Sequence, residues 1–273
     1  MQGNKIDSVG YVGINFKSDN ISVTNNFISN FCLLKSDGGG IYTWNGDQKN
    51  NTNQTIKGNI IIGSQVGPVP AIGISPHIDG IYADDCSTNL NITDNTITNC
   101  PNSGIYLHGG NGIKVLRNTC YDNGIQFSFN ITKNCDNVNN TIHDNIFFSK
   151  TKNQPVAIYG KQRNPGDDYG NFENNIYSSP DPTQSLISGA NEESKYSHRV
   201  SLVQWRSQFS KDMTSRSIGG PQIYNSNITF VYNASQQAKT VQLQGNYKDV
   251  TNKAFSGQIV LQPYTSAILV KSN

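Results

Sequence analysis

Two short patterns alternate along the first 180 residues of this chain, and they constrain its fold more than any other feature. One is a triplet of glycine, isoleucine and a polar or aromatic residue, at Gly13-Ile14-Asn15, Gly40-Ile41-Tyr42, Gly80-Ile81-Tyr82, Gly104-Ile105-Tyr106 and Gly124-Ile125-Gln126. The other is an asparagine just ahead of an apolar residue, at Asn26, Asn59, Asn95, Asn118, Asn145 and Asn175, spaced by 33, 36, 23, 27 and 30 residues. A recurring unit of this length indicates stacked structural repeats.

Each unit is too small to bury an apolar face alone, because its strands are very short, so neighbouring units must stack. An asparagine at the same point of every coil suits a sharp bend, since this residue tolerates unusual backbone angles and its amide can bond backbone groups of neighbouring coils. The composition agrees with this interpretation. The chain has 37 Asn but only three Glu and two Met, so good helix formers are scarce and a helical bundle is excluded.

With these repeats the chain resembles a right-handed parallel β-helix, of the kind found in pectate-lyase-like proteins and in several glycoside hydrolase families. The resemblance covers roughly residues 8–180, and we assign residues 1–180 to the coils. The first repeat appears by residue 13 with no capping helix ahead of it, although an open end would expose unpaired strand edges. We therefore expect that the N-terminal coils and cap of a longer protein are missing, or that another subunit or a short segment covers this end.

After residue 180 the pattern changes. Residues 181–220 form a linker in which Leu202, Val203, Trp205 and Phe209 fall at helical spacing, which predicts one short amphipathic helix packed on the coils. Residues 221–273 alternate as strands separated by turns. Their tail, LQPYTSAILVK, resembles the C-terminal region of secreted bacterial β-helix glycosidases, in which a small β-sandwich follows the solenoid. The resemblance implies an antiparallel β-sandwich-like domain with a capping role.

Period-two alternation sorts the side chains of the triplet strands into inward and outward columns. If the triplet isoleucines point inward, one outward column is Tyr42, Tyr82, Tyr106 and Gln126, and the next is Trp44, Asp84, His108 and Ser128. Side chains in one column of neighbouring coils stand about 4.8 Å apart. Aromatic, carboxylate and imidazole groups therefore share one surface, and these are the groups that a sugar site needs.

Because the chain has so few glutamates, a two-carboxylate mechanism must use aspartates. Glycoside hydrolysis needs two carboxyl groups, about 5–5.5 Å apart for retention and about 6.5–9.5 Å apart for inversion. We expect Asp84 to be one of them and Asp85 or Asp79 to be the other, with His108 orienting Asp84 or bonding the sugar. The segment GIYADD resembles the region that carries active-site aspartates in β-helix glycosidases such as the β-xylosidase-like ones. There a glutamate is expected on the following coil, where this chain has His108.

Six further side chains are candidates for substrate contacts, and they come from the same strands or the turns before them: Asp37, Tyr42, Trp44, His77, Tyr82 and Tyr106. Each also has a structural interpretation. An aspartate before glycine, such as Asp37 or Asp79, commonly forms a turn. Tyrosine columns can simply rigidify a sheet. The convergence of aspartate, histidine and tryptophan on three consecutive coils favours a site.

Two other functions remain open. A uronate lyase or C5-epimerase would abstract the C5 proton with a Lys, Arg, His or Tyr base while a cation or Ca²⁺ neutralises the carboxylate. The segment Ser75-Pro76-His77-Ile78-Asp79 is similar to the DPHD motif of alginate C5-epimerases, except at Ser75 and the inserted Ile78. The other alternative is a non-catalytic glycan-binding solenoid of a phage or surface protein. We expect no cofactor and no metal for a hydrolase, and Ca²⁺ only for a lyase.

The net charge of +2, without a Lys/Arg cluster, argues against nucleic acid or a membrane surface as partner and favours a neutral poly- or oligosaccharide. We expect a monomer that is secreted or periplasmic, with a signal peptide absent from this sequence. The cysteines are odd in number and lack C-x-x-C spacing. They predict buried free thiols rather than a zinc site or a disulfide framework, and they are Cys32, Cys86, Cys100, Cys120 and Cys135.

Overall fold

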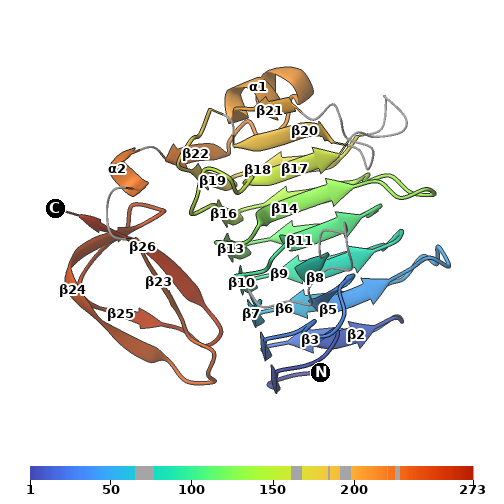
Figure 1. Cartoon of the computed structure of the whole chain (residues 1–273), viewed down its shortest axis with the longest axis horizontal. Coiled ribbons are helices and arrows are strands. Elements are labelled where there is room, and N and C mark those ends of the chain that lie inside the picture. The colour runs from blue at the N-terminus through green and yellow to red at the C-terminus, as the bar shows by residue number, and fades with distance from the viewer. Residues whose placement is uncertain are drawn as a thin grey trace.

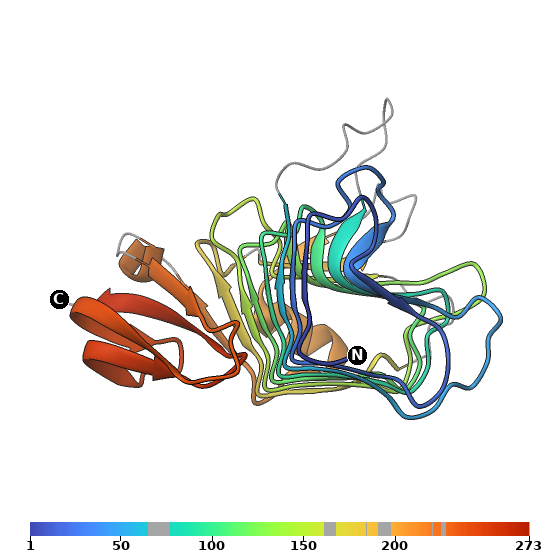
Figure 2. The same cartoon turned by 90° about the horizontal axis from the view of Figure 1, so that it is seen from below.

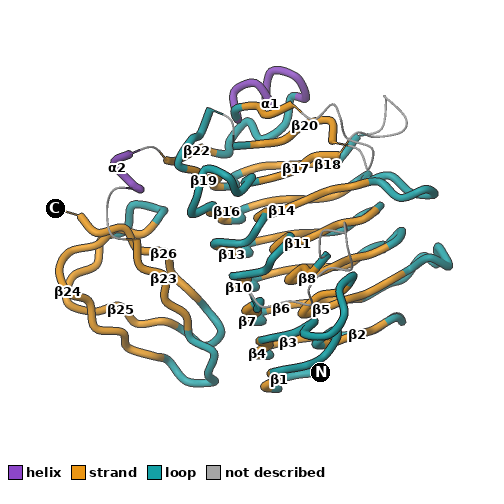
Figure 3. The backbone as a smooth tube through the Cα atoms, viewed as in Figure 1, coloured by secondary structure: helices purple, strands orange, loops and turns teal. Residues whose placement is uncertain are grey.

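Each coil of the chain consists of three short strands that run in turn through three sheets, here called sheets 1, 2 and 3 (Figure 1). The computed structural model describes residues 1–64, 77–160, 168–183, 185–190, 198–219, 221–224 and 228–272. Equivalent strands of successive coils pair in parallel, which confirms the parallel β-helix expected from the sequence. Loops of different lengths connect the strands at the corners of the coils (Figure 3).

Sheet 1 carries the triplet strands, and its members are β2 (Ile14–Phe16), β5 (Gly38–Trp44), β8 (Ile78–Asp84), β11 (Ser103–His108), β14 (Ile125–Asn130), β17 (Ala157–Gly160), β20 (Leu186–Ala190) and the antiparallel β21 (His198–Val200). Sheet 2 consists of β3 (Ser22–Thr24), β6 (Gln54–Lys57), β9 (Leu90–Thr93), β12 (Lys114–Leu116), β15 (Asn140–His143) and β18 (Gly170–Glu173). Sheet 3 consists of β1 (Lys5–Asp7), β4 (Phe27–Ser29), β7 (Ile60–Ile62), β10 (Thr96–Thr98), β13 (Thr119–Tyr121), β16 (Ile146–Phe148), β19 (Ile176–Ser179) and β22 (Arg216–Gly219).

The six repeated asparagines lie at the corner between sheets 2 and 3 and form a continuous buried ladder. The side-chain oxygen of Asn118 accepts hydrogen bonds from the backbone and side-chain amides of Asn95, both at 3.0 Å. The Asn118 amide donates in turn to the side-chain oxygen of Asn145 at 3.0 Å and to the carbonyl of Ile92 at 2.9 Å. Polar groups that would otherwise be buried unpaired are thus satisfied from coil to coil.

The residue that makes this corner is the one before each ladder asparagine, so the prediction that the asparagine itself makes the bend was wrong. The preceding residues all have a left-handed φ between 53° and 63°, and they are Asn25, Gly58, Asp94, Arg117, Asp144 and Asn174. The ladder asparagines themselves keep ordinary backbone angles. The ladder position therefore requires an amide side chain, and the bend is made next to it.

The coil interior is filled by aligned columns of apolar side chains. In sheet 3 the residues in register are Ile28, Ile61, Ile97, Cys120, Phe147 and Tyr177. The two largest side chains of this column, Phe147 and Tyr177, belong to the C-terminal coils. In sheet 1 the inward column includes Tyr159, whose ring stacks on Trp205 at a centroid distance of 4.1 Å.

The fifth triplet does not occupy the predicted position. Strand β11 pairs with β14 in a register that places Tyr106 opposite Ser128 and His108 opposite Asn130. The predicted partners, Gln126 for Tyr106 and Ser128 for His108, were therefore two residues out of register. Gln126 is fully buried and does not continue the outward column.

The parallel sheets run past residue 180, because β20 pairs with β17 and β22 pairs with β19. Between them lies α1 (Leu202–Phe209), where the spacing predicts a helix. Its start is fixed by a capping box in which Ser201 and Gln204 bond each other's backbone amides. Leu202 and Trp205 are buried against the coils, as predicted, whereas Val203 is 71% exposed.

After α2 (Pro221–Tyr224) the chain forms an antiparallel sheet of β23 (Ile228–Tyr232), β24 (Lys239–Asp249), β25 (Ala254–Leu261) and β26 (Ser266–Ser272). This sheet lies beside sheet 3 (Figures 1 and 2) and shares an apolar cluster with it, in which the ring of Phe230 stacks on Tyr121 at 4.6 Å. In the described residues its four strands form a single sheet, which buries one apolar cluster among its own strands and another against the solenoid. It therefore covers the side of the coils. Neither described helix has the length and hydropathy needed to span a lipid bilayer.

Candidate functional site

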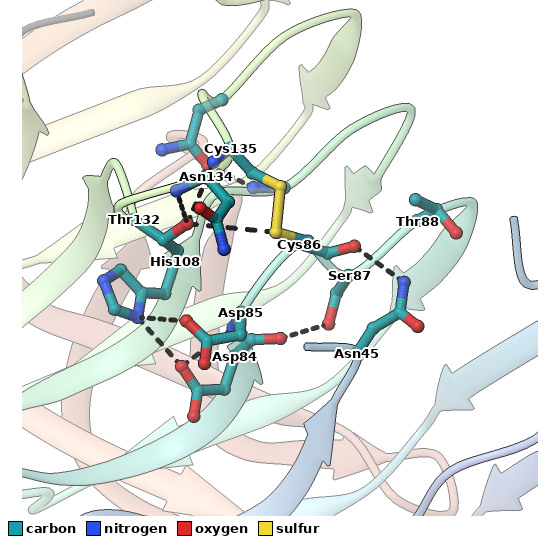
Figure 4. The surroundings of a disulfide bond; sticks show 12 residues. Asn45, Asp84, Asp85, Cys86, Ser87, Thr88, His108, Thr132, Asn134 and Cys135 are labelled. Atoms are coloured by element: carbon teal, nitrogen blue, oxygen red, sulfur yellow. Dashed lines mark hydrogen bonds and ion pairs between the residues drawn. A yellow bond between two sulfur atoms is a disulfide. The ribbon is translucent and has the colours of Figure 1, made fainter. Parts of the chain in front are cut away.

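The carboxyl ends of β5, β8 and β11 bring three of the predicted side chains together on the outside of sheet 1. The register pairs Trp44 with Asp84 and Tyr42 with Tyr82. One coil further, His108 extends the same column, and its Nδ1 lies 2.8 Å from Oδ1 of Asp84 (Figure 4). The predicted neighbours Trp44, Asp84 and His108 are thus adjacent.

Asp84 is the most tightly held member of the cluster. Only 7% of it is exposed, and its Oδ2 accepts a hydrogen bond from the Tyr42 hydroxyl at 2.8 Å. Its Oδ1 accepts from the Asp85 backbone N–H and meets His108, both at 2.8 Å. Burial by itself would raise the pKa of Asp84, but hydrogen bonds from His108, Tyr42 and Tyr82 outweigh it and hold the pKa below its ordinary value. Asp84 is therefore ionised at neutral pH, and Nδ1 of His108 carries the proton that they share.

Asp85 faces solvent next to this buried carboxylate. Its side chain is 40% exposed, its φ of 30° is unusual for a non-glycine residue, and its Oδ2 accepts from the Trp44 indole N–H at 2.9 Å. The Trp44 ring is itself held, because Lys17 Nζ lies 4.0 Å from the ring centroid and a Cβ at Gly46 would overlap the ring. Trp44 therefore positions Asp85, and its ring is only partly available to a sugar.

One oxygen of each carboxylate and one His108 nitrogen lie within 4.8 Å of one another. This set can be compared with a calcium site, which a lyase would use. Ca²⁺ takes six to eight oxygen ligands, whereas this cluster offers two carboxylates and an imidazole. The oxygens of Asp84 already accept hydrogen bonds from Tyr42, His108 and the Asp85 backbone. The residues therefore fit a hydrogen-bonded acid–base cluster better than a calcium site.

The outward tyrosine column is present but largely closed. Tyr82 and Tyr106 stack at a centroid distance of 4.9 Å, and they are only 4% and 3% exposed. Tyr42 packs edge-on against Tyr82 at 5.3 Å and stays half-buried. The Tyr106 ring also stacks on His108 at 5.5 Å. Tyr82 and Tyr106 thus support the rings and carboxylate beside them, and Tyr42 is the more accessible tyrosine.

Asp37, His77 and Asp79 lie at the other end of the strands. Asp37 has a left-handed φ of 62°, as a turn former does, and its N–H donates to the His77 carbonyl at 2.7 Å. The His77 ring is exposed and lies 6.0 Å from the Tyr106 ring. Asp79 precedes Asp84 by five residues of extended strand, a distance of about 16 Å. The structure therefore pairs Asp84 with Asp85 and not with Asp79. Ser75 and Pro76 lie outside the described residues.

Asp79 is nevertheless an unusual carboxyl group, because it is fully buried. Its Oδ1 accepts from the Ser103 backbone N–H at 2.7 Å and from the Asn102 amide at 2.8 Å. Its Oδ2 has no hydrogen-bond partner within the described part of the chain. Burial raises the pKa of Asp79 to about 7, against the effect of these donors.

We expect Asp79→Asn to stabilise the protein above pH 7 and to have little effect near pH 4. The unfolded carboxyl ionises near pH 4 and the folded one near pH 7, so stability falls as pH rises through this window. A neutral amide removes that loss, which is at most about 4 kcal/mol. Unfolding at pH 4.5 and pH 8 measures it, with the surface variant Asp94→Asn as control. An equal effect of Asp79→Asn at both pH values would contradict the assignment.

A disulfide that the cysteine spacing did not predict lies next to this site. Cys86 and Cys135 form it, with Cα atoms 5.4 Å apart, whereas Cys32, Cys100 and Cys120 are buried free thiols as predicted. The expectation of free thiols was therefore wrong for Cys86 and Cys135. Cys86 follows Asp85 directly, and its backbone N–H donates to the His108 carbonyl at 3.2 Å. The disulfide thus fixes the turn that carries Asp85 (Figure 4).

A sequence model of the family described as "Right handed beta helix region" matches residues 1–176. The chain belongs to this right-handed β-helix family. Comparison with curated proteins and with solved structures gives no match. Membership of the right-handed β-helix family is compatible with polysaccharide-acting enzymes. Because one fold hosts many activities, the chemistry has to be inferred from the cluster itself.

Proposed function

We propose that this right-handed β-helix protein is a glycoside hydrolase that acts on a poly- or oligosaccharide, with Asp84 and Asp85 as its two carboxyl groups. The observation that carries the proposal is the cluster of these carboxylates with His108 on the outside of sheet 1. Solenoid faces of this kind can bind an extended chain along neighbouring coils.

The two carboxyl groups are suited to different roles. A carboxyl group whose pKa is held low, like that of Asp84, cannot serve as the acid at neutral pH. Asp84 is therefore the anionic partner that attacks or stabilises the positively charged sugar in the transition state. Asp85, which is more exposed, is the group that transfers the proton to the leaving oxygen. His108 and Tyr42 keep Asp84 ionised and oriented.

The short separation of the carboxylates favours a retaining reaction. Their nearest oxygens lie within 4.8 Å of each other. This upper limit lies below the spacing of about 6.5–9.5 Å that leaves room for the activated water of an inverting enzyme, and it fits the closer carboxyl groups of a retaining enzyme. The anomeric form of the first product, followed by nuclear magnetic resonance, distinguishes the two outcomes.

The disulfide supports a location outside the cytosol, because disulfides persist mainly in oxidising compartments. We propose that the protein is secreted or periplasmic and acts as a monomer. Cell fractionation combined with thiol labelling tests the location. A reduced Cys86 in cytosolic protein would count against it.

The function is tested by incubating the protein with neutral and uronate polysaccharides and scoring reducing ends together with ultraviolet absorbance. We expect new reducing ends without absorbance, at a rate that a chelator does not change. Absorbance that depends on Ca²⁺ would identify a lyase, because a lyase product carries a new double bond. Binding without either signal would identify a non-catalytic glycan-binding protein.

A further inference from the structure

A cavity of about 360 Å³ lies beside the Cys86–Cys135 disulfide, on the side of the solenoid where Asp85 is found. Cys86 lines the cavity and directly follows Asp85 in the chain. The other side chains at its rim include Gln48, Thr88, Asn111, Asn134 and Asp136. The volume is near the lower end of the range for small-molecule sites, about 300–1,000 Å³, and suits a single sugar ring better than a long segment of chain.

The walls of this cavity are the stacked turns of consecutive coils. The Asn111 backbone N–H donates to the Ser87 carbonyl at 3.0 Å, and the Asn89 backbone N–H donates to the Asn111 carbonyl at 3.0 Å. The next turn is joined in the same way, because the Val138 backbone N–H donates to the Gly110 carbonyl at 3.0 Å. Together with the disulfide, these bonds hold the cavity in place before any ligand arrives. A ligand therefore does not have to order the walls, which favours binding.

The lining has the chemistry of a site for hydroxyl groups. The side chains of Gln48, Asn111 and Asn134 offer amides, which both donate and accept hydrogen bonds. The Thr88 hydroxyl is already used, because it donates to the Lys49 carbonyl at 3.2 Å. Asp136 is the carboxylate of the described lining, which contains no lysine or arginine. A uronate carboxylate would meet a like charge in this lining. The lining therefore favours a neutral sugar.

Gln48 and Asn134 are the side chains best placed to form hydrogen bonds with a ligand. Both are exposed. Their side-chain amides make no hydrogen bond to another described residue, although the Asn134 backbone N–H donates to Thr132 at 3.1 Å. Asn134 adjoins Cys135, so the disulfide fixes its position (Figure 4).

We propose that this cavity is a subsite that binds one neutral sugar residue of the glycan, next to the bond that Asp84 and Asp85 cleave. The assignment rests on the proposed hydrolase function for the position of the bond, but the recognition of a neutral sugar rests on the lining alone. Hydrogen bonds from Gln48 and Asn134 hold the sugar hydroxyls, and the Asp136 carboxylate in the lining disfavours a uronate.

The test is a binding titration of Asp84→Asn protein with xylohexaose, mannohexaose, cellohexaose and hexagalacturonate, followed by calorimetry. We expect at least one neutral hexasaccharide to bind more tightly than hexagalacturonate. Adding Gln48→Ala or Asn134→Ala should weaken that binding by about fivefold to tenfold each, the effect of losing one hydrogen bond. Gln258→Ala on the exposed side of β25 is the matched control and should not change the affinity.

The outcomes separate this inference from the hydrolase proposal. If wild-type protein releases reducing ends but the Gln48 and Asn134 variants bind as tightly as their parent, the subsite proposal is wrong and the hydrolase proposal is supported. If those variants bind more weakly but wild-type protein releases no reducing ends, the subsite proposal is supported and the hydrolase proposal is wrong. Preference for hexagalacturonate, or no binding of any hexasaccharide, overturns the subsite.

Discussion

Replacing Asp84 with asparagine is expected to lower kcat by about a hundredfold to ten-thousandfold while leaving the circular dichroism spectrum unchanged. The amide oxygen can take the place of Oδ1 and accept from His108 and the Asp85 N–H, while the amide N–H takes the place of Oδ2 and donates to the Tyr42 hydroxyl oxygen, so the local geometry is kept. The negative charge is lost, and with it the group that meets the developing charge of the sugar. Initial rates of reducing-end release on the best substrate of the panel provide the measurement.

Asp94→Asn is the matched control for this experiment. Asp94 is also an aspartate on the outside of a coil, but it pairs with Arg117 at 2.7 Å. It lies at the corner between sheets 2 and 3, whereas Asp84 ends a strand of sheet 1. An exposed ion pair contributes little to stability, and its loss should leave kcat unchanged. Turnover at the wild-type rate in Asp84→Asn would show that the proposed catalytic site is wrong.

The coil architecture could be predicted because the ladder is a local requirement repeated in the sequence. Each coil needs an amide at one corner, so Asn26 to Asn175 recur there whatever the loops between them do. The triplet carries less information. A Gly-Ile pair fits more than one position along an inward-facing strand, so the sequence could not show that Gln126 lies inside and that Ser128 follows Tyr106.

The site residues that lie on strands could be predicted from period-two alternation. The disulfide, which lies in the loops, could not. Trp44, Asp84 and His108 share a column because they occupy equivalent strand positions. The disulfide joins turns that are 49 residues apart and skips the coil between them. Gly109 on that intervening coil makes this possible, because a Cβ there would lie 2.9 Å from the Cys135 Cβ. Its φ of +70° also favours glycine, yet neither fact is visible in the spacing of the cysteines.

The asparagine ladder leads to the largest expected effect on stability, which is that of Asn118→Ala. The truncation leaves the Asn95 backbone N–H, the Asn95 amide and the Ile92 carbonyl buried without their partner. Each such group costs about 1–3 kcal/mol, so the expected loss for the three is roughly 3–9 kcal/mol. A domain of ordinary stability has about 5–15 kcal/mol in total, so the variant should be largely unfolded or marginally stable.

The position of Asn118 in the middle of the stack adds to this effect. In a solenoid each coil is stabilised mainly by its two neighbours, so a defect in a central coil separates the coils on either side of it. Asn171→Ala, at an exposed position of β18, is the control and should change the free energy of unfolding by less than about 0.5 kcal/mol. Urea denaturation followed by circular dichroism compares the two variants. Equal stability of Asn118→Ala and Asn171→Ala would show that the ladder amides contribute no more than surface ones, and the coils would then be held by their apolar columns alone.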